Sequence, residues 1–168
     1  MAPMGSLRTV YRFLSPKLVE AGYRVVALDL RGHGQSSTGF ADYSIAAHGR
    51  GALALVKQID VGPAFLVGNS FSGGVAVWAS VEEPEMVKGI VLIGSFVRKP
   101  KVNPIIALVM KLMLSGPWGA SAWMSFYPRM YPHRKPDDFA ENVATHPWPC
   151  LACEAAANIR PPRRPCAT

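Results

Sequence analysis

The sequence predicts an α/β protein in which a short parallel sheet is flanked by helices. Three apolar runs, at residues 23–30, 63–68 and 87–94, are short and rich in Val, Leu and Ile, as buried strands are. Stretches with apolar residues at helical spacing separate them. Alternating strands and helices are typical of α/β folds, and right-handed crossovers make such strands parallel.

Composition favours one globular domain that does not bind nucleic acid. A chain of 168 residues, 49% of them hydrophobic, is long enough to bury a core. The net charge is +7, and residues 98–168 carry 10 Lys and Arg against 4 Asp and Glu, so the excess lies in the second half. No stripe of interleaved basic and aromatic residues accompanies it, so we expect no nucleic-acid partner.

The sequence also argues against a membrane span, a metal and a secretory leader. The longest apolar run, residues 104–114, contains Lys111 and is too short to cross a bilayer. The first residues lack the charged and apolar regions of a signal peptide, so we expect a cytoplasmic protein. Cys150 and Cys153 form a Cys-x-x-Cys pair without a second pair of ligands, so no metal and no cofactor are expected.

The first half contains two further predicted helices. Residues 7–21 have helical spacing, with Pro16 expected to divide the helix into two pieces or to kink it, and Gly22 at the stop. A glycine-rich loop runs to residue 41. A helix over residues 43–59 then follows; its expected inward residues are Ile45, Leu53, Val56 and Ile59.

After residue 95 the pattern changes to short helices without strands. We expect helices at 104–115, 118–127 and 136–144, separated by Gly and Pro. Residues 146–168 have no hydrophobic period and are rich in Pro, so they are expected to be a disordered tail. The predicted organisation is therefore a core at 1–97, a helical segment at 98–145 and a tail at 146–168.

The most informative stretch is residues 63–74. A buried strand ends at Gly68 and small residues open a helix, so Ser70 is expected on a sharp strand-to-helix turn. Such a turn exposes a serine hydroxyl at the carboxyl end of a sheet, and the backbone N–H of Phe71 can point at a developing oxyanion. Gly68 and Ser72 are small, as the crowded turn requires.

This stretch resembles the nucleophile elbow of the α/β-hydrolase family, although the usual G-x-S-x-G is here G-x-S-x-S. Residues 29–36 add a D-x-R-G-x-G-x-S loop like the one that precedes the elbow in that family. The resemblance covers about residues 5–138. It implies a partial α/β-hydrolase fold whose serine hydrolase activity on a carboxylic ester, thioester or amide passes through an acyl-enzyme on Ser70. It also implies a small, apolar acyl substrate.

The rest of the family's catalytic machinery is only partly identifiable. Met4 stands where the resemblance places a second oxyanion N–H. The family's order of serine, acid and histidine is matched by Ser70, then Asp137 or Asp138, then His146, but no strand precedes these candidates.

The remaining histidines and Asp29 are expected to be structural. His33 is expected to support its glycine-rich loop, and Asp29 to anchor its own loop by hydrogen bonds. His48 and His133 are expected to be solvated.

The resemblance also indicates a missing strand and a helical cap. In the family, a strand lies between those that end here at Leu30 and Val67, and its absence leaves a gap of about 10 Å. We therefore predict either a three-stranded sheet or poor stability. The cap-like segment has apolar residues that either line an acyl pocket or pack against the body; these are Met110, Met113, Trp118, Trp123 and Met124.

Two functional interpretations stay open at this point. One is a serine hydrolase that uses Ser70. The other is a truncated, non-catalytic relative or a remnant that binds small molecules, because the composition changes abruptly near residue 145 and the acid and base are not identified.

Overall fold

The computed structural model of the chain describes residues 1–95, 103–105, 108–109, 112, 118–131 and 135–144. It forms two compact units. The first combines residues 1–31 with 42–100, and the second combines residues 32–41 with 101–168. The domain ends predicted at 97 and 145 lie outside the described residues and stay predictions.

The sheet of the first unit has two parallel strands. Strand β1, Ala64–Asn69, pairs with β2, Val87–Ile93, and Leu66 lies opposite Ile90. The crossover consists of α3, Phe71–Glu82, and the short 3-10 helix η2, Pro84–Met86. This confirms the predicted strand, helix, strand sequence and its parallel direction.

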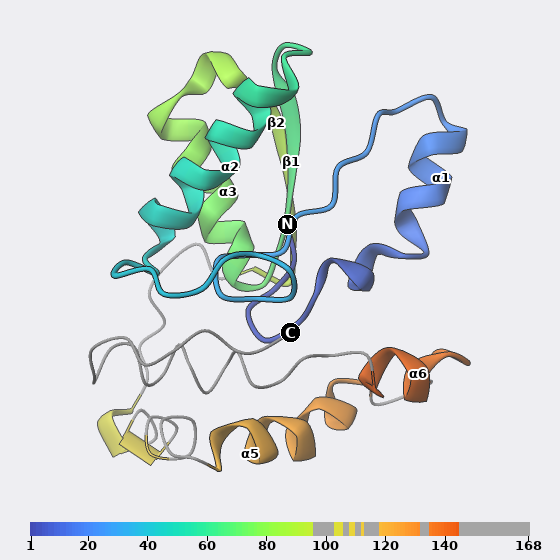
Figure 1. Cartoon of the computed structure of the whole chain (residues 1–168), viewed down its shortest axis with the longest axis vertical. Coiled ribbons are helices and arrows are strands. Elements are labelled where there is room, and N and C mark those ends of the chain that lie inside the picture. Colours follow the sequence, from blue (N-terminus) through green and yellow to red (C-terminus); the bar gives the residue numbers. More distant parts are fainter. Residues whose placement is uncertain (96–102, 106–107, 110–111, 113–117, 132–134, 145–168) are drawn as a thin grey trace. The chain divides into compact units, whose positions relative to one another are not determined.

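Helix α2, Ile45–Ile59, lies beside α3 on one side of the sheet (Figure 1). Its start is capped by Ser44, whose Oγ accepts a hydrogen bond of 3.2 Å from the N–H of Ala47. The main apolar cluster joins α2, α3 and β1 through Leu53, Val56, Leu66, Ala76 and Ala79.

The inward face predicted for α2 is correct at its centre and wrong at its start. Leu53 and Val56 are buried and Ile59 is partly buried, but Ile45 is 39% exposed. The buried stripe of α2 begins at Ala47, so the first turn of the helix extends beyond the packed face.

Residues 23–30 do not form the predicted strand. No residue of this segment belongs to a strand, and the sheet has two strands in place of the three expected. The reason is that a strand exists only beside a partner. In the described backbone, this segment has two hydrogen bonds to other residues: the Ala2 N–H bonds the Leu28 carbonyl at 3.2 Å, and the Tyr23 N–H bonds the Leu18 carbonyl in the turn after the preceding helix, and neither belongs to a ladder. Poor stability, the other predicted consequence of the missing strand, stays a prediction.

The N-terminal helix is divided into two pieces, as predicted. These are the 3-10 helix η1, Arg8–Tyr11, and α1, Leu14–Glu20. The break precedes Pro16, which lies in the first turn of α1, where its missing N–H costs no helical hydrogen bond.

The predicted stop at Gly22 is confirmed by a Schellman motif. Gly22 has φ +85° and its N–H bonds the Val19 carbonyl at 2.9 Å. The N–H of Tyr23 bonds the Leu18 carbonyl at 3.0 Å, which closes the motif.

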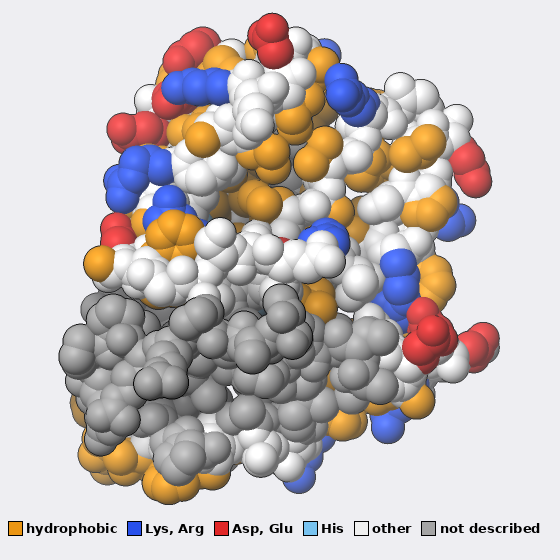
Figure 2. All heavy atoms as spheres, viewed as in Figure 1, with side chains coloured by type: hydrophobic (Ala, Val, Ile, Leu, Met, Phe, Trp, Pro, Cys, Tyr) orange, Lys and Arg blue, Asp and Glu red, His pale blue; other side chains and the backbone are white. Residues whose placement is uncertain are grey.

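Much apolar surface of the first unit faces outward. No residue of α1 is buried, and Val26 and Phe65 are 50% and 53% exposed. Figure 2 shows hydrophobic side chains at the surface over the sheet and beside α1. This exposure is expected where a sheet and its helices lack some of the elements that would cover them.

The second unit combines the turns of residues 32–41 with helices in the described residues after 103. Helices α5, Gly119–Phe126, and α6, Phe139–Ala144, confirm two predicted helices, with the 3-10 helix η3, Tyr127–Met130, between them. Residues 104–105, 108–109 and 112 are also helical. Tyr127, Tyr131 and Phe139 form an aromatic cluster with ring centroids 5.1 to 6.0 Å apart.

The predicted apolar cap face is only partly described. Trp118 is 58% exposed. Met110 and Met113, like the tail 146–168, lie outside the described residues, and the side chains of Trp123 and Met124 do so as well. Within the described part of the chain, no helix has the length and apolarity needed to cross a membrane.

Candidate active site

The sharp turn predicted at Ser70 is present. Strand β1 ends at Asn69, α3 begins at Phe71, and Ser70 alone connects them with φ 54° and ψ −119°. A residue with a side chain is strained there, at a cost of about 1 to 3 kcal/mol. Both backbone polar groups of Ser70 are hydrogen-bonded. The Ser70 N–H bonds the Ile93 carbonyl at 2.9 Å, and the Ser70 carbonyl accepts from the Gly73 N–H at 3.1 Å.

Gly68 is required by the close approach of α3 to the end of β1. A Cβ atom built on Gly68 would lie 2.6 Å from the Cα of Gly73 and also against the carbonyl oxygen of Ser72. Real Cβ atoms do not come so close, so any side chain would push the helix away from the strand. The prediction that the turn needs a small residue here is therefore confirmed.

Ser72, at the position of the second glycine in the usual motif, ties the turn together. It is fully buried, and its Oγ accepts from the Asn69 N–H at 2.8 Å. The same hydroxyl lies 2.8 Å from the Met1 carbonyl and 3.0 Å from the Asn69 carbonyl, so its single hydrogen is donated to one of these two acceptors. The serine that replaces the usual glycine thus contributes a hydroxyl that lies within hydrogen-bond distance of the first residue of the chain.

Two backbone N–H groups are candidates for binding an oxyanion. The Phe71 N–H is the first of α3 and has no acceptor among the described residues, and it lies at the positive end of the helix dipole. Met4 lies in a turn closed by Ser6 N–H to the Pro3 carbonyl at 3.2 Å, and its own N–H likewise lacks an acceptor in the described chain.

The N-terminal residues are anchored beside this turn. The Met1 amine bonds the Val67 carbonyl at 2.8 Å, and the Tyr11 hydroxyl donates to the Met1 carbonyl at 2.6 Å. Burial lowers the pKa of the Met1 amine to about 6 and raises the pKa of Tyr11 to about 12. Ala2 is fully buried, so this short stretch is part of the core.

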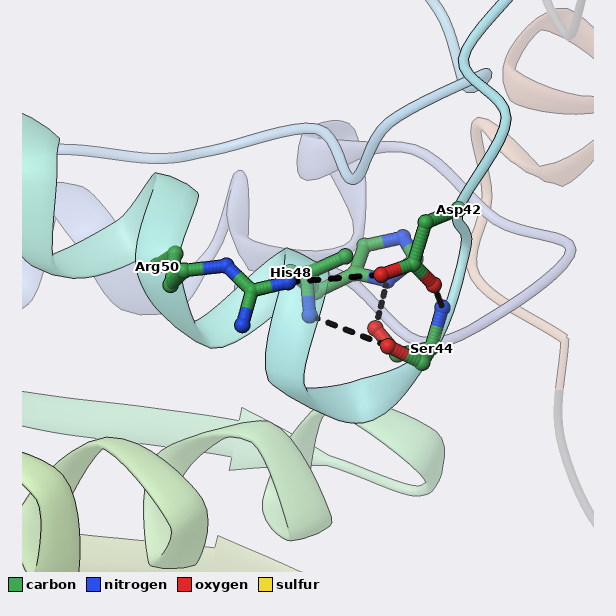
Figure 3. Close-up of polar contacts among 5 residues, drawn as sticks. Asp42, Ser44, His48 and Arg50 are labelled. Carbon is green, nitrogen blue, oxygen red and sulfur yellow. Dashed lines mark hydrogen bonds and ion pairs between the residues drawn. The ribbon is translucent and has the colours of Figure 1, made fainter.

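His48 is buried, which corrects the expectation that it is solvated. Only 5% of it is exposed, and its Nδ1 lies 2.9 Å from the Ser44 carbonyl (Figure 3). The imidazole also meets the Phe71 ring edge-on, with centroids 5.4 Å apart. Its Nε2 is buried without a partner in the described structure. His48 shares a face of α2 with Ala52 and Val56, and this spacing was the signal for burial.

The loop before α2 positions Ser44, whose carbonyl contacts the His48 ring. The Asp42 carboxylate accepts from the Ser44 N–H at 2.8 Å and lies 3.3 Å from the Arg50 guanidinium, as Figure 3 shows. The hydrogen bonds from Ser44, with smaller help from Arg50, lower the pKa of Asp42. The Asp42 side chain is about half exposed and supports the start of the helix.

Asp29 binds a different element of the first unit. Its buried carboxylate accepts from the Arg8 N–H at 2.6 Å and from the Arg8 guanidinium at 2.5 Å, which fixes η1 to the end of residues 23–30. The expectation that Asp29 anchors its own loop stays a prediction.

The structure does not assemble the predicted acid and base with Ser70. Asp137 and Asp138 belong to the second unit, so neither is placed relative to Ser70. The Asp138 carbonyl accepts from the Asn142 N–H at 2.9 Å, at the start of α6. His146, like His133, lies outside the described residues. His33 is buried, with 5% exposed.

A groove of about 530 Å³ lies elsewhere on the first unit. Its lining comes from α1 and from the extended residues that follow it; the lining residues are Arg12, Ser15, Pro16, Val19, Glu20, Val25 and Ala27. None of the elbow residues lines this groove, so it does not identify a site for substrate at Ser70.

Comparison with known proteins agrees with the elbow and its surroundings. The family model of the alpha/beta hydrolase fold matches residues 4–139. A putative carbamate hydrolase of Variovorax paradoxus is 30% identical over 129 residues, which cover 76% of this chain and 48% of the relative. An uncharacterised protein of Mycobacterium tuberculosis is 33% identical over 105 residues, 62% of this chain and 30% of the relative.

A solved structure shows the same fold. The esterase of Exiguobacterium antarcticum superposes with a TM-score of 0.74 at 16% identity, over 96% of this chain and 65% of the esterase. The chain thus spans less than half the length of the curated relatives just described. The family match over residues 4–139, together with the strained serine between β1 and α3, establishes that the chain belongs to the α/β-hydrolase fold family.

Proposed function

We propose that the protein is a serine hydrolase that attacks a carboxylic ester, thioester or amide with Ser70. The observation that carries the proposal is the backbone at Ser70, where φ 54° and ψ −119° hold a non-glycine residue in a strained turn between β1 and α3. Strain of this kind is kept where surrounding contacts over-determine it, and at nucleophile elbows it exposes the hydroxyl.

The proposed chemistry follows from the groups around Ser70. Its Oγ forms a bond to the carbonyl carbon of the substrate, the alcohol, thiol or amine leaves with a proton, and water then hydrolyses the acyl-enzyme. The Phe71 N–H, with that of Met4, donates to the oxyanion that forms during both steps. The proposed substrate is a small, apolar acyl compound, and no cofactor takes part.

The acid and base set the rate of such an enzyme. Asp137, Asp138 and His146 stay the candidates by their order in the sequence. In a serine protease, loss of the base lowers kcat by roughly 10⁶, and the oxyanion hole and binding retain about 10³ to 10⁴ over the uncatalysed reaction. We therefore expect slow turnover from this chain. The cytoplasmic location also stays a prediction.

A second candidate is a non-catalytic relative that binds small molecules at the same turn. It is favoured by one observation from the sequence: no strand is predicted before Asp137, Asp138 or His146, whereas the family carries its acid and base at strand ends. Such a protein would keep the elbow fold without forming an acyl-enzyme.

A fluorophosphonate probe distinguishes the two candidates, because it reacts with activated serines. The hydrolase predicts labelling of the wild-type chain that disappears in Ser70→Ala. Ser80→Ala is the matched control, since Ser80 lies in α3 and its hydroxyl only bonds the Val77 carbonyl. Circular dichroism must first show that each variant is folded. No labelling of folded wild-type protein would refute the hydrolase and leave the binding relative.

A further inference from the structure

His48 is a buried imidazole that packs against the turn at Ser70 and has no part in the chemistry proposed above. It lies near the start of α2 and is 5% exposed. Its ring meets the Phe71 ring edge-on, with centroids 5.4 Å apart and an angle of 80° between the two planes. Phe71 directly follows Ser70 and opens α3. The imidazole therefore contacts the residue whose N–H is the proposed oxyanion donor.

Hydrogen bonds fix the orientation of this imidazole. The Ser44 carbonyl lies 2.9 Å from the His48 Nδ1 and also accepts from the His48 backbone N–H at 3.1 Å (Figure 3). Because a carbonyl only accepts, the hydrogen of the first contact belongs to Nδ1. Ser44 is itself held, since its Oγ caps α2 at the Ala47 N–H and its own N–H donates to the Asp42 carboxylate at 2.8 Å. The capped start of α2 thus sets the direction of the ring.

The second ring nitrogen of His48 is not explained by stability. The Nε2 atom is buried and has no hydrogen-bond partner in the described residues. An unpaired buried polar atom destabilises a fold, and an apolar ring of similar size avoids that loss. The Ser44 carbonyl would still accept from the backbone N–H of residue 48 after such a replacement. An imidazole at this position therefore needs a reason other than stability.

We propose that His48 is a positioning residue, whose hydrogen-bonded ring holds Phe71 so that the Phe71 N–H points at the oxyanion. Such a donor is effective only when it is fixed before the reaction begins. On the strand side, α3 is already fixed, because the backbone of Gly73 lies against Gly68. His48 holds the first residue of α3 from the side of α2. The inference rests on the proposed function, since the direction of this N–H matters to the reaction only if Ser70 reacts.

The test is the substitution His48→Phe, which keeps an aromatic ring but removes the hydrogen bond that orients it. Fluorophosphonate labelling at several probe concentrations gives the affinity for the probe and the maximal labelling rate. We expect the maximal rate to fall about tenfold and the affinity to change less than about twofold, because an oxyanion donor acts in the reaction. The urea midpoint is expected to stay equal or to rise. A purely structural role predicts a lower midpoint with an unchanged labelling rate of the folded protein.

Trp78→Phe is the matched control, because Trp78 lies against Gly49 of α2 and lies seven residues, about 10 Å, further along α3 than Phe71. We expect this variant to lower the urea midpoint and to leave the maximal labelling rate unchanged. Phe71→Leu removes the ring that the imidazole meets. In that background His48→Phe is expected to cause no further loss of rate, and a further tenfold loss would contradict the proposed contact.

A second measurement separates this inference from the hydrolase. The NMR order parameter of the Phe71 N–H is expected near the rigid value of about 0.85 in the wild type and in Trp78→Phe, and lower in His48→Phe. That result in a folded wild type without labelling would refute the hydrolase and support the positioning. An unchanged order parameter, or an unchanged maximal labelling rate, in His48→Phe would overturn the inference. If His48→Phe does not fold, His48→Asn keeps a donor for Ser44 without a ring; the same losses are expected, and their absence refutes the proposal.

Discussion

Replacing Ser72 tests whether the departure from the usual elbow motif is structural. In Ser72→Ala the partly buried Asn69 N–H loses its acceptor, a loss that costs about 1 to 3 kcal/mol for a buried group. The Met1 carbonyl still accepts from the Tyr11 hydroxyl, so no second buried group is left unpaired. We therefore expect a loss of about 2 kcal/mol. Ser72→Gly restores the usual motif. We expect it to lower the free energy of unfolding by roughly 1 kcal/mol more than Ser72→Ala does, because glycine is a poorer helix former than alanine in the first turns of α3.

The predicted order of stability is wild type, then Ser72→Ala, then Ser72→Gly. Urea unfolding followed by far-ultraviolet circular dichroism gives the free energy of unfolding from the midpoint and slope. Ser80→Ala is the control in the same helix, because its hydroxyl bonds a carbonyl that the helix already uses. We expect Ser80→Ala to change the free energy of unfolding by less than about 0.5 kcal/mol.

The result that would refute this reasoning is a Ser72→Gly chain as stable as the wild type or more so. It would mean that Asn69 finds another acceptor and that glycine is simply the better residue for the turn. A Ser72→Ala loss no larger than that of Ser80→Ala would contradict the bridging role of the hydroxyl in the same way.

Three further predictions concern the same region. Gly68→Ala is expected to cost about 3 kcal/mol and to abolish probe labelling, because its methyl meets the backbone of α3; labelling retained at wild-type stability would contradict the close contact. Ser70→Gly is expected to lose labelling yet gain about 1 kcal/mol in urea unfolding, whereas Asp60→Gly gains less, because Asp60, with φ 51° and ψ 48°, lies in an allowed left-handed region. One tyrosine is expected to ionise near pH 12 in an ultraviolet titration, and Tyr11→Phe removes that step. Because folding raises this pKa above its usual value of 10, the stabilising contribution is complete below pH 10 and is lost as pH rises through 12; ionisation of every tyrosine near pH 10 in the folded chain would refute it.

Features set by neighbouring residues were predictable from the sequence. The turn at Ser70 follows from an apolar run that ends in small residues, and the stop at Gly22 follows from the freedom of glycine at positive φ. Each involves only residues a few positions apart. Such features therefore form from local interactions and do not depend on the arrangement of the rest of the fold.

Features that need distant partners were predicted less well. Residues 23–30 have the composition of a buried strand, but composition cannot supply the neighbour whose N–H and C=O groups complete a ladder. His48 was misjudged for a related reason: its polarity suggested solvent, while the Phe71 ring and the Ser44 carbonyl, one of them far along the chain, provide a buried environment. The same limit applies to the acid and base of the candidate site.

The hydroxyl of Ser72 belongs to both kinds of feature, because it bonds the nearby Asn69 and also lies against the distant Met1. The elbow is strained at Ser70, so contacts around it must offset about 1 to 3 kcal/mol. On the β2 side, the Ile93 carbonyl supplies an ordinary hydrogen bond to the turn. On the opposite side, where a full ladder is missing, Ser72 carries the contact from Asn69 to Met1. The geometry of the turn at Ser70 therefore depends, in this chain, on the side chain of a residue only two positions away.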